Sequence, residues 1–144
     1  MSTLIVGMGG LRDQLGEQAE QNGLKHVHFL GHQTQQTVAR INNAADIATF
    51  PSRVEPFGLV AIEAMACGTP VVTTNQGGFP DFVNDRVGAL VDVDSPDQLA
   101  EAIIADIDAK ATKGKAAAEY AADGFSWKQK VAEFYELYER VTAQ

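Results

Sequence analysis

Two glutamates, Glu55 and Glu63, are the residues of this chain whose types and spacing most clearly suggest chemistry. Glu63 falls in the most apolar helix-like stretch, residues 59–67 (LVAIEAMAC), where an unpaired buried carboxylate is costly. Glu55 precedes Pro56, which suits a first helical position, and Gly58, which lets a ligand approach the backbone. The pattern predicts a loop carboxylate, a helix N-terminus with free N–H groups and a second carboxylate inside the helix. We expect such a site to bind a ligand with both hydroxyl and phosphate groups.

Short apolar strands alternate with helices along the chain. The predicted strands are residues 4–6, 27–30, 47–50, 71–74 and 88–91. The predicted helices are residues 11–22, 34–43, 59–67, a segment that starts at Pro96, an Ala-rich segment 110–122, and residues 127–142. In the segment that starts at Pro96, Ser95 is the predicted N-cap, and the residues predicted to face inward are Leu99, Ile103 and Ile107. This order predicts an α/β fold, a Rossmann-like parallel sheet of about five strands with helices on both faces. We expect residues 1–144 to form a single donor-binding domain that helix 127–142 closes. Ligands of such sheets bind at the carboxyl ends of the strands.

The composition excludes several classes of protein. The 144 residues, 45% apolar and 21% charged, suffice for one globular domain with a core. A formal net charge of −8 argues against a nucleic-acid binder that neutralises phosphates. Cys67 is the only cysteine, which rules out an internal disulfide and fits a reducing compartment. No apolar run approaches the ~20 residues that span a bilayer, and no signal peptide is visible, so we expect a cytoplasmic location.

An ordered set of motifs resembles the donor-binding C-terminal domain of GT-B-fold retaining glycosyltransferases. The resemblance is to glycosyltransferase group 1, or family 4, the group that includes sucrose-phosphate synthase. It covers nearly the whole chain and rests on IVGMG at 5–9, VHFLGH at 27–32, FPS at 50–52, EPFGL at 55–59, EAMACGTPVV at 63–72, GG at 77–78, GALV at 88–91 and FSW at 125–127. The two glutamates alone would be a weak signal, whereas the ordered set is a strong one.

The resemblance implies a site for a nucleotide-diphosphate-sugar, in UDP or GDP form, with no cofactor and no metal. Glu55, the predicted catalytic residue, would lie near hydroxyls of the transferred sugar, and Glu63 would hydrogen-bond the ribose. Backbone N–H groups would come from residues 57–59, and the full predicted set of substrate-binding residues is Glu63, Phe57, Gly58, Leu59, Gly7, Gly9, His32 and Ser52. Two alternatives stay open: Glu63 as a structural residue paired with a lysine or a backbone donor, and Glu55 as a solvated loop carboxylate.

The resemblance also implies parts that this sequence does not contain. The family's domain begins with an earlier strand–helix unit, whose arginine and lysine neutralise the diphosphate, and follows an acceptor-binding N-terminal domain. We do not assign Arg53, the nearest cation to Glu55, as a substitute. We therefore expect the isolated chain to bind a donor without turnover. The family's retaining reaction would use front-face departure and attack, with no protein nucleophile.

The absent strand would be central in a sheet of this type, and its loss would leave two interior edges unpaired. We expect a domain fragment that rearranges its sheet or forms a homodimer through these edges. An alternative is a non-catalytic interaction or assembly module derived from a donor domain. A sugar-nucleotide epimerase of the same fold is a minor alternative, because it would need an intact two-domain cleft.

Three further motifs favour ordinary structural roles. The run GMGG at 7–10 lacks the third glycine of a dinucleotide fingerprint, because Arg12 stands there. Asp92 and Asp94 precede a helix start and favour a solvated turn over a metal site. No cysteine or carboxylate completes a metal site with the histidines His26, His28 and His32. The aromatic residues of the last helix are Trp127, Phe134, Tyr135 and Tyr138. We interpret them mostly as packing residues, and the alternative is that they form an exposed apolar patch.

Overall fold

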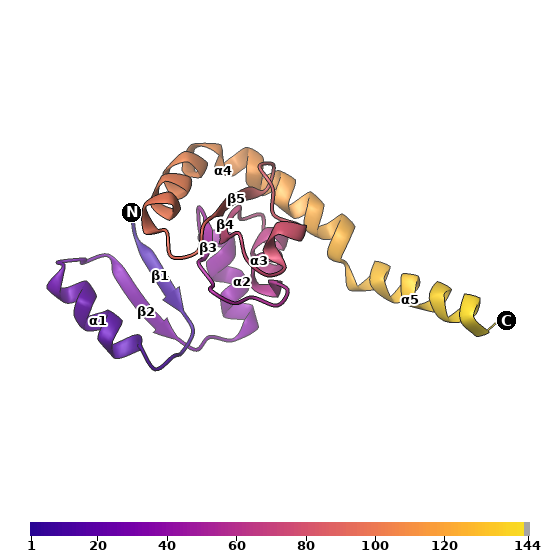
Figure 1. Ribbon diagram of the computed structural model, residues 1–144, viewed down its shortest axis with the longest axis horizontal. Helices are drawn as coiled ribbons and strands as arrows, with labels where there is room; N and C mark the ends of the chain where they lie inside the picture. Colours follow the sequence, from indigo (N-terminus) through magenta and orange to yellow (C-terminus); the bar gives the residue numbers. More distant parts are fainter. Residues whose placement is uncertain (143–144) are drawn as a thin grey trace. The chain divides into compact units, whose positions relative to one another are not determined.

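The computed structural model describes residues 1–142 as an α/β fold with five strands, which pair in parallel within each sheet (Figure 1). The strands are β1 (Thr3–Val6), β2 (Val27–Gly31), β3 (Ala48–Phe50), β4 (Val71–Thr74) and β5 (Gly88–Val91). They form two small sheets, β1-β2 and β3-β4-β5. The predicted fold class is confirmed, with the sheet divided in two. The chain correspondingly separates into two compact units, the first ending at Arg40 and the second beginning at Ile41.

The first unit consists mainly of β1, α1 (Arg12–Gln21) and β2. The two strands pair in parallel from Thr3 opposite Val27 to Val6 opposite Gly31, with one irregularity between Ile5 and Val6. All four residues of β1 are exposed within the described part of the chain, although three of them are large and apolar. α2 (Gln35–Ala44) contains the boundary between the two units.

In the second unit, β4 lies in the middle of the sheet, and all four of its residues are buried. α3 (Leu59–Ala66) packs against β3 and β4, and α4 (Pro96–Phe125) packs against α3, β4 and β5. Two glycines permit these close approaches. A Cβ on Gly88 would lie 1.8 Å from the carbonyl oxygen of Val71, and one on Gly114 would lie 2.2 Å from that of Gly68.

α4 is one continuous helix of 30 residues, where the sequence suggested two helical segments. Lys113 on α4 binds the sheet, because its Nζ donates to the carbonyl oxygen of Gly88 in β5 at 3.0 Å. The same Nζ donates to Oδ1 of Asp106, on the same helix, at 2.7 Å. The side chains of Lys113 and Asp106 are 18% and 8% exposed. Ser95 occupies the predicted N-cap position, but its side chain makes no capping hydrogen bond.

α5 (Trp127–Thr142) has the predicted bounds and follows the end of α4 (Figure 1). None of its residues is buried, and Trp127 is 85% exposed. The interpretation of the α5 aromatic residues mainly as packing residues is wrong for the part of the chain that the structure describes, because four of them are exposed, as the alternative of an exposed apolar patch requires: Trp127, Phe134, Tyr135 and Tyr138. Within residues 1–142, no helix combines the length and the apolar character needed to cross a membrane.

Candidate functional site

Residues 55–58, called the glutamate loop below, connect β3 to the N-terminus of α3. The N–H of Gly58 donates to Oε1 of Glu55 at 2.9 Å, and Gly58 is the buried N-cap residue of α3 with φ of 98°. Glu55 is half-buried, so it is more constrained than a freely solvated loop carboxylate. The sequence predicted a free N–H group at Gly58, and the structure instead shows that group bonded to the neighbouring carboxylate.

Glu63 is exposed, so it is not an unpaired carboxylate held among buried apolar side chains. α3 buries Ala61, Ile62, Ala64 and Met65. The helical period places Leu59 and Glu63 on another side of the helix, where Leu59 is 63% exposed and its neighbour Val60 is 44% exposed. Glu63 forms no ion pair within the described residues 1–142, so the alternative of a lysine-paired structural glutamate finds no support there. The result is an apolar, uncovered helix face with one carboxylate on it.

The carboxylate of Glu63 affects the pKa of the Cys67 thiol. Burial raises the pKa of the Cys67 thiol, and the nearby negative charge of Glu63 raises that pKa further. Both effects disfavour the thiolate. The negative charge of Glu63 therefore acts on the thiol of Cys67, the C-cap residue of α3.

An aromatic cluster supports the glutamate loop, and the sequence analysis did not identify it. The ring of Phe57 lies 6.2 Å from that of Phe82 and 6.4 Å from that of Phe125, with centroid distances typical of tilted and edge-to-face pairs. Phe82 and Phe125 are themselves 5.7 Å apart. The sequence gives little signal for this cluster, because its members come from the loop, the segment after β4 and the end of α4.

Ser52, at the carboxyl end of β3, is tied to the neighbouring strand. Its carbonyl oxygen accepts a 2.6 Å hydrogen bond from Oγ1 of Thr74, the last residue of β4.

Arg53 forms an ion pair at the surface, in which its Nε donates to Oδ1 of Asp94 at 2.7 Å. Asp94 adopts φ of 58°, and Asp92 pairs with Gln98. The two aspartates thus have protein partners at the surface.

The predicted residues Gly7, Gly9 and His32 all lie in the first unit. The N–H of Gly7 donates to the carbonyl oxygen of Gly31 at 2.8 Å, which joins the residue after β1 to the last residue of β2. His32 comes directly after β2 and is exposed. Ser52, Glu63 and residues 55–59 lie in the second unit, where Ser52 follows β3, residues 55–58 precede α3, and Leu59 and Glu63 lie on α3.

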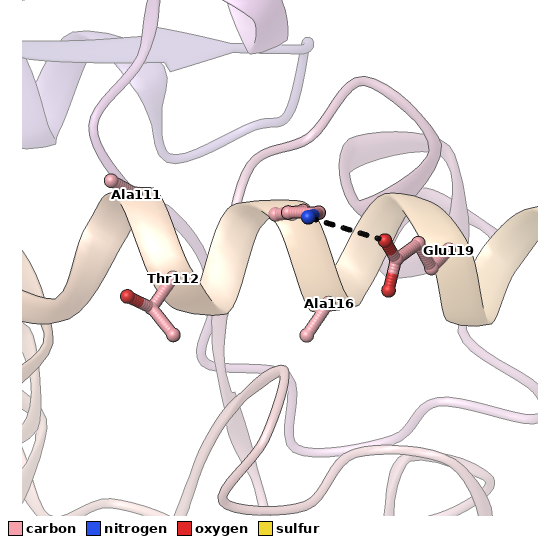
Figure 2. A pocket seen from close by; sticks show the side chains of 5 residues that line it. Ala111, Thr112, Ala116 and Glu119 are labelled. Atoms are coloured by element: carbon pink, nitrogen blue, oxygen red, sulfur yellow. Dashed lines mark ion pairs between the residues drawn. The ribbon is translucent and has the colours of Figure 1, made fainter.

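One surface hollow lies along α4, and no predicted site residue lines it (Figure 2). Its lining comes from a single stretch of that helix: Ala111, Thr112, Lys115, Ala116 and Glu119. Lys115 and Glu119 form an exposed ion pair with a separation of 3.9 Å. A hollow on one helix surface, with no polar groups converging from other elements, is not a candidate site.

Comparison with known proteins identifies the family. The family model described as "Glycosyl transferases group 1" matches residues 1–123. The D-inositol 3-phosphate glycosyltransferase of Mycolicibacterium vanbaalenii is 42% identical over 145 residues, which cover 95% of this chain and 31% of the relative. This chain therefore spans 31% of the length of that curated relative.

Two solved structures share the fold at similar levels of identity. Sucrose-phosphate synthase from Thermosynechococcus elongatus superposes with a TM-score of 0.84 at 33% identity, over 97% of this chain and 38% of that one. The Anabaena protein HepE, solved in complex with UDP-glucose, gives a TM-score of 0.81 at 30% identity, over 94% of this chain and 40% of that one. The resemblance to the C-terminal domain of GT-B enzymes is thus confirmed, and the chain belongs to the group 1 glycosyltransferase family.

Proposed function

We propose that this chain binds a nucleotide-diphosphate-sugar, most simply UDP-glucose, as the donor-binding part of a glycosyltransferase. The sugar would pass to an acceptor with retention of configuration at the anomeric carbon. The isolated chain would bind the donor without turning it over. We further propose a cytoplasmic location for the protein.

The arrangement of two carboxylates around one helix start carries this proposal. Glu55 sits at the N-terminus of α3 with its Oε1 2.9 Å from the N–H of Gly58. Glu63 stands on the exposed side of the same helix without an ion-pair partner in residues 1–142. A carboxylate accepts two hydrogen bonds from a vicinal diol, and a helix N-terminus favours an anion. A sugar nucleotide offers both kinds of group.

The residue roles follow from this assignment. Glu63 would bind the ribose hydroxyls, beside the exposed apolar side chains of Leu59 and Val60. Glu55 would face hydroxyls of the transferred sugar, and the backbone N–H groups of Phe57 and Leu59 would face the sugar or the phosphates, whereas the Gly58 N–H holds the Glu55 carboxylate. The solved complex of HepE with UDP-glucose supports the choice of ligand, because that protein is 30% identical to this chain over 94% of this chain. Gly7, Gly9, His32 and Ser52 remain predicted donor contacts.

Calorimetric titration with UDP-glucose tests the proposal. The unmodified chain should bind, and Glu63→Gln should weaken binding by roughly tenfold or more, because an amide loses one acceptor and the charge. Glu101→Gln is the matched control, since Glu101 is also an exposed helical glutamate. Equal affinities of the unmodified chain and the Glu63→Gln variant would remove the proposed ribose contact. A parallel titration with GDP-glucose distinguishes the two nucleotides.

One observation favours a second function, self-assembly through a sheet edge. Within the described residues β3 pairs only with β4, so one edge of β3 is open. At β5, by contrast, Lys113 binds the Gly88 carbonyl. An open edge strand is a template for pairing with another chain. Sedimentation measures whether the chain forms a stable dimer, for which an interface above ~1,000 Å² is typical. A stable dimer that shows no affinity for UDP-glucose in the calorimetric titration would favour the assembly module over the donor site.

A further inference from the structure

The loop that follows β4 presses two glycines against the glutamate loop. A Cβ on Gly77 would lie 1.6 Å from the carbonyl oxygen of Glu55, and a Cβ on Gly78 would lie 2.5 Å from that of Phe57. The N–H of Gly78 also donates to the carbonyl oxygen of Glu55 at 3.2 Å. No side chain fits between these two backbones. Residues 77–78 are called the glycine clamp below.

The two glycines are required for different reasons. Gly77 has φ of +59°, in the left-handed region that L-residues with a Cβ adopt at a cost. Gly78 has φ of −81°, which any residue adopts. A side chain at position 77 therefore meets both backbone strain and a steric clash. A side chain at position 78 meets only the clash with Phe57, so this position isolates the effect of the contact.

The residue after the clamp adds a third contact. Phe79 is fully buried, and a Cβ on Gly58 would lie 2.7 Å from its ring. Gly58 is also the residue whose N–H holds Oε1 of Glu55. Before the loop in the chain, the Thr74 hydroxyl donates to the carbonyl oxygen of Ser52. The segment after β4 thus contacts the glutamate loop at Glu55, Phe57 and Gly58, and Thr74 holds the chain just before the loop.

We propose that Gly77 and Gly78 are positioning residues of the donor site, which set the place of the Glu55 carboxylate and of the loop's N–H groups. The identity of the ligand in this proposal rests on the proposed donor function. The placement of the glutamate loop by the two glycines rests on the contacts described above. A side chain in the clamp displaces the loop, because the atoms it meets are backbone atoms that cannot rotate away. A displacement of about 1 Å at such a site can reduce function roughly 100-fold.

The test uses the 144-residue chain with Gly78→Ala and, separately, Gly77→Ala. Calorimetry measures the dissociation constants for UDP-glucose and for UDP. We expect UDP-glucose to bind about tenfold more weakly or worse in each variant. UDP should lose less, because the proposed ribose contact, Glu63, lies on α3 beyond the loop. NMR hydrogen exchange at the Gly58 amide should become faster, because its hydrogen bond to Glu55 is disturbed.

Two control variants separate positioning from general destabilisation. Gly124→Ala places a Cβ where no other atom lies within 4 Å, so affinity and Gly58 exchange should stay unchanged. Thr69→Val removes a buried hydrogen bond to the carbonyl oxygen of Asn42, outside the glutamate loop. It should lower stability without changing the affinity of the folded chain. If the clamp acts through Glu55, adding Gly78→Ala to Glu55→Ala should cause little further loss.

The possible results distinguish the clamp from the donor function. Unchanged UDP-glucose affinity and unchanged Gly58 exchange in Gly78→Ala overturn the clamp alone. A loss no greater than that of Thr69→Val does the same. If the unmodified chain binds neither UDP-glucose nor UDP, the donor function fails, and with it the clamp's role toward a donor. Should Gly77→Ala not fold, Gly78→Ala decides, because its backbone conformation suits alanine.

Discussion

Glu55 and Gly58 are joined by a 2.9 Å hydrogen bond from the backbone N–H of the glycine to the glutamate carboxylate. This bond closes a short turn directly before α3 and gives the helix N-terminus a negatively charged cap. Such a charge at a helix start is favourable, because the first N–H groups of a helix have no intrahelical acceptor. The same carboxylate is the proposed contact to the donor sugar, so the proposal gives it a functional role beside its structural one.

The structural role of Glu55 predicts unequal effects of two substitutions. Glu55→Ala should lower the free energy of unfolding by about 1 kcal/mol, the typical value of a lost N-terminal cap. Glu55→Gln should cost less, because its amide oxygen can still accept from Gly58. Urea denaturation followed by circular dichroism measures both, with Glu101→Ala as the control at an exposed helical position. Equal stability of the alanine variant and the unmodified chain would contradict a capping role.

Two buried threonines predict opposite responses to the same replacement by valine. Thr69 Oγ1 donates to the carbonyl oxygen of Asn42 at 2.6 Å, whereas Thr73 Oγ1 is buried without a partner in residues 1–142. Thr69→Val should therefore lower the free energy of unfolding by about 0.5–1.5 kcal/mol, because it removes a buried hydrogen bond while the Asn42 carbonyl oxygen keeps its 3.1 Å bond from the Ala45 N–H. Thr73→Val should be neutral or stabilising, since it removes a desolvated hydroxyl. Thermal melts of the two variants compare them directly, and a larger loss at Thr73 would refute the assignment.

The ion pair between Lys113 and Asp106 predicts a strong effect of removing one partner. Lys113→Met leaves the carboxylate of Asp106 uncompensated in a side chain that is only 8% exposed, which should cost about 3–5 kcal/mol. The double variant Lys113→Met/Asp106→Leu should recover much of this loss, because no buried charge remains. Denaturant titrations of the single and double variants give the coupling energy. A double variant no more stable than Lys113→Met would speak against the charge as the cause.

Cys67 predicts a pH-dependent test of the position of Glu63. Burial and the Glu63 charge both raise the pKa of the thiol, so removing the charge should lower that pKa toward the ordinary value. In Glu63→Gln, the pH profile of Cys67 alkylation by iodoacetamide should move to lower pH, because the thiolate is the reactive form. Burial persists, so the shift should be partial. Glu101→Gln should leave the profile in place, and superimposable profiles for Glu63→Gln would contradict the proximity of the two groups.

Local sequence signals predicted much of the fold and part of the site. Runs of apolar residues gave the five strands, and the period of α3 with Gly58 before it gave a helix start beside Glu55. The exposure of Leu59 and Val60 was not predicted, because an apolar sequence on all sides of a helix does not show which side the sheet covers. The single 30-residue helix α4 was divided in the prediction, since its polar and Ala-rich stretches look separate without the Lys113 contact to β5.

By itself, the sequence determined the α/β class, the family and the order of motifs, because these depend on residue types at fixed local spacings. Only the tertiary structure decided that Gly77 and Gly78 lie against Glu55 and Phe57. These residues are about twenty positions apart in the chain, and they meet because β3 and β4 pair in parallel and end at the same edge. The division of five strands into two sheets was likewise a matter of long-range pairing, which local propensity leaves open.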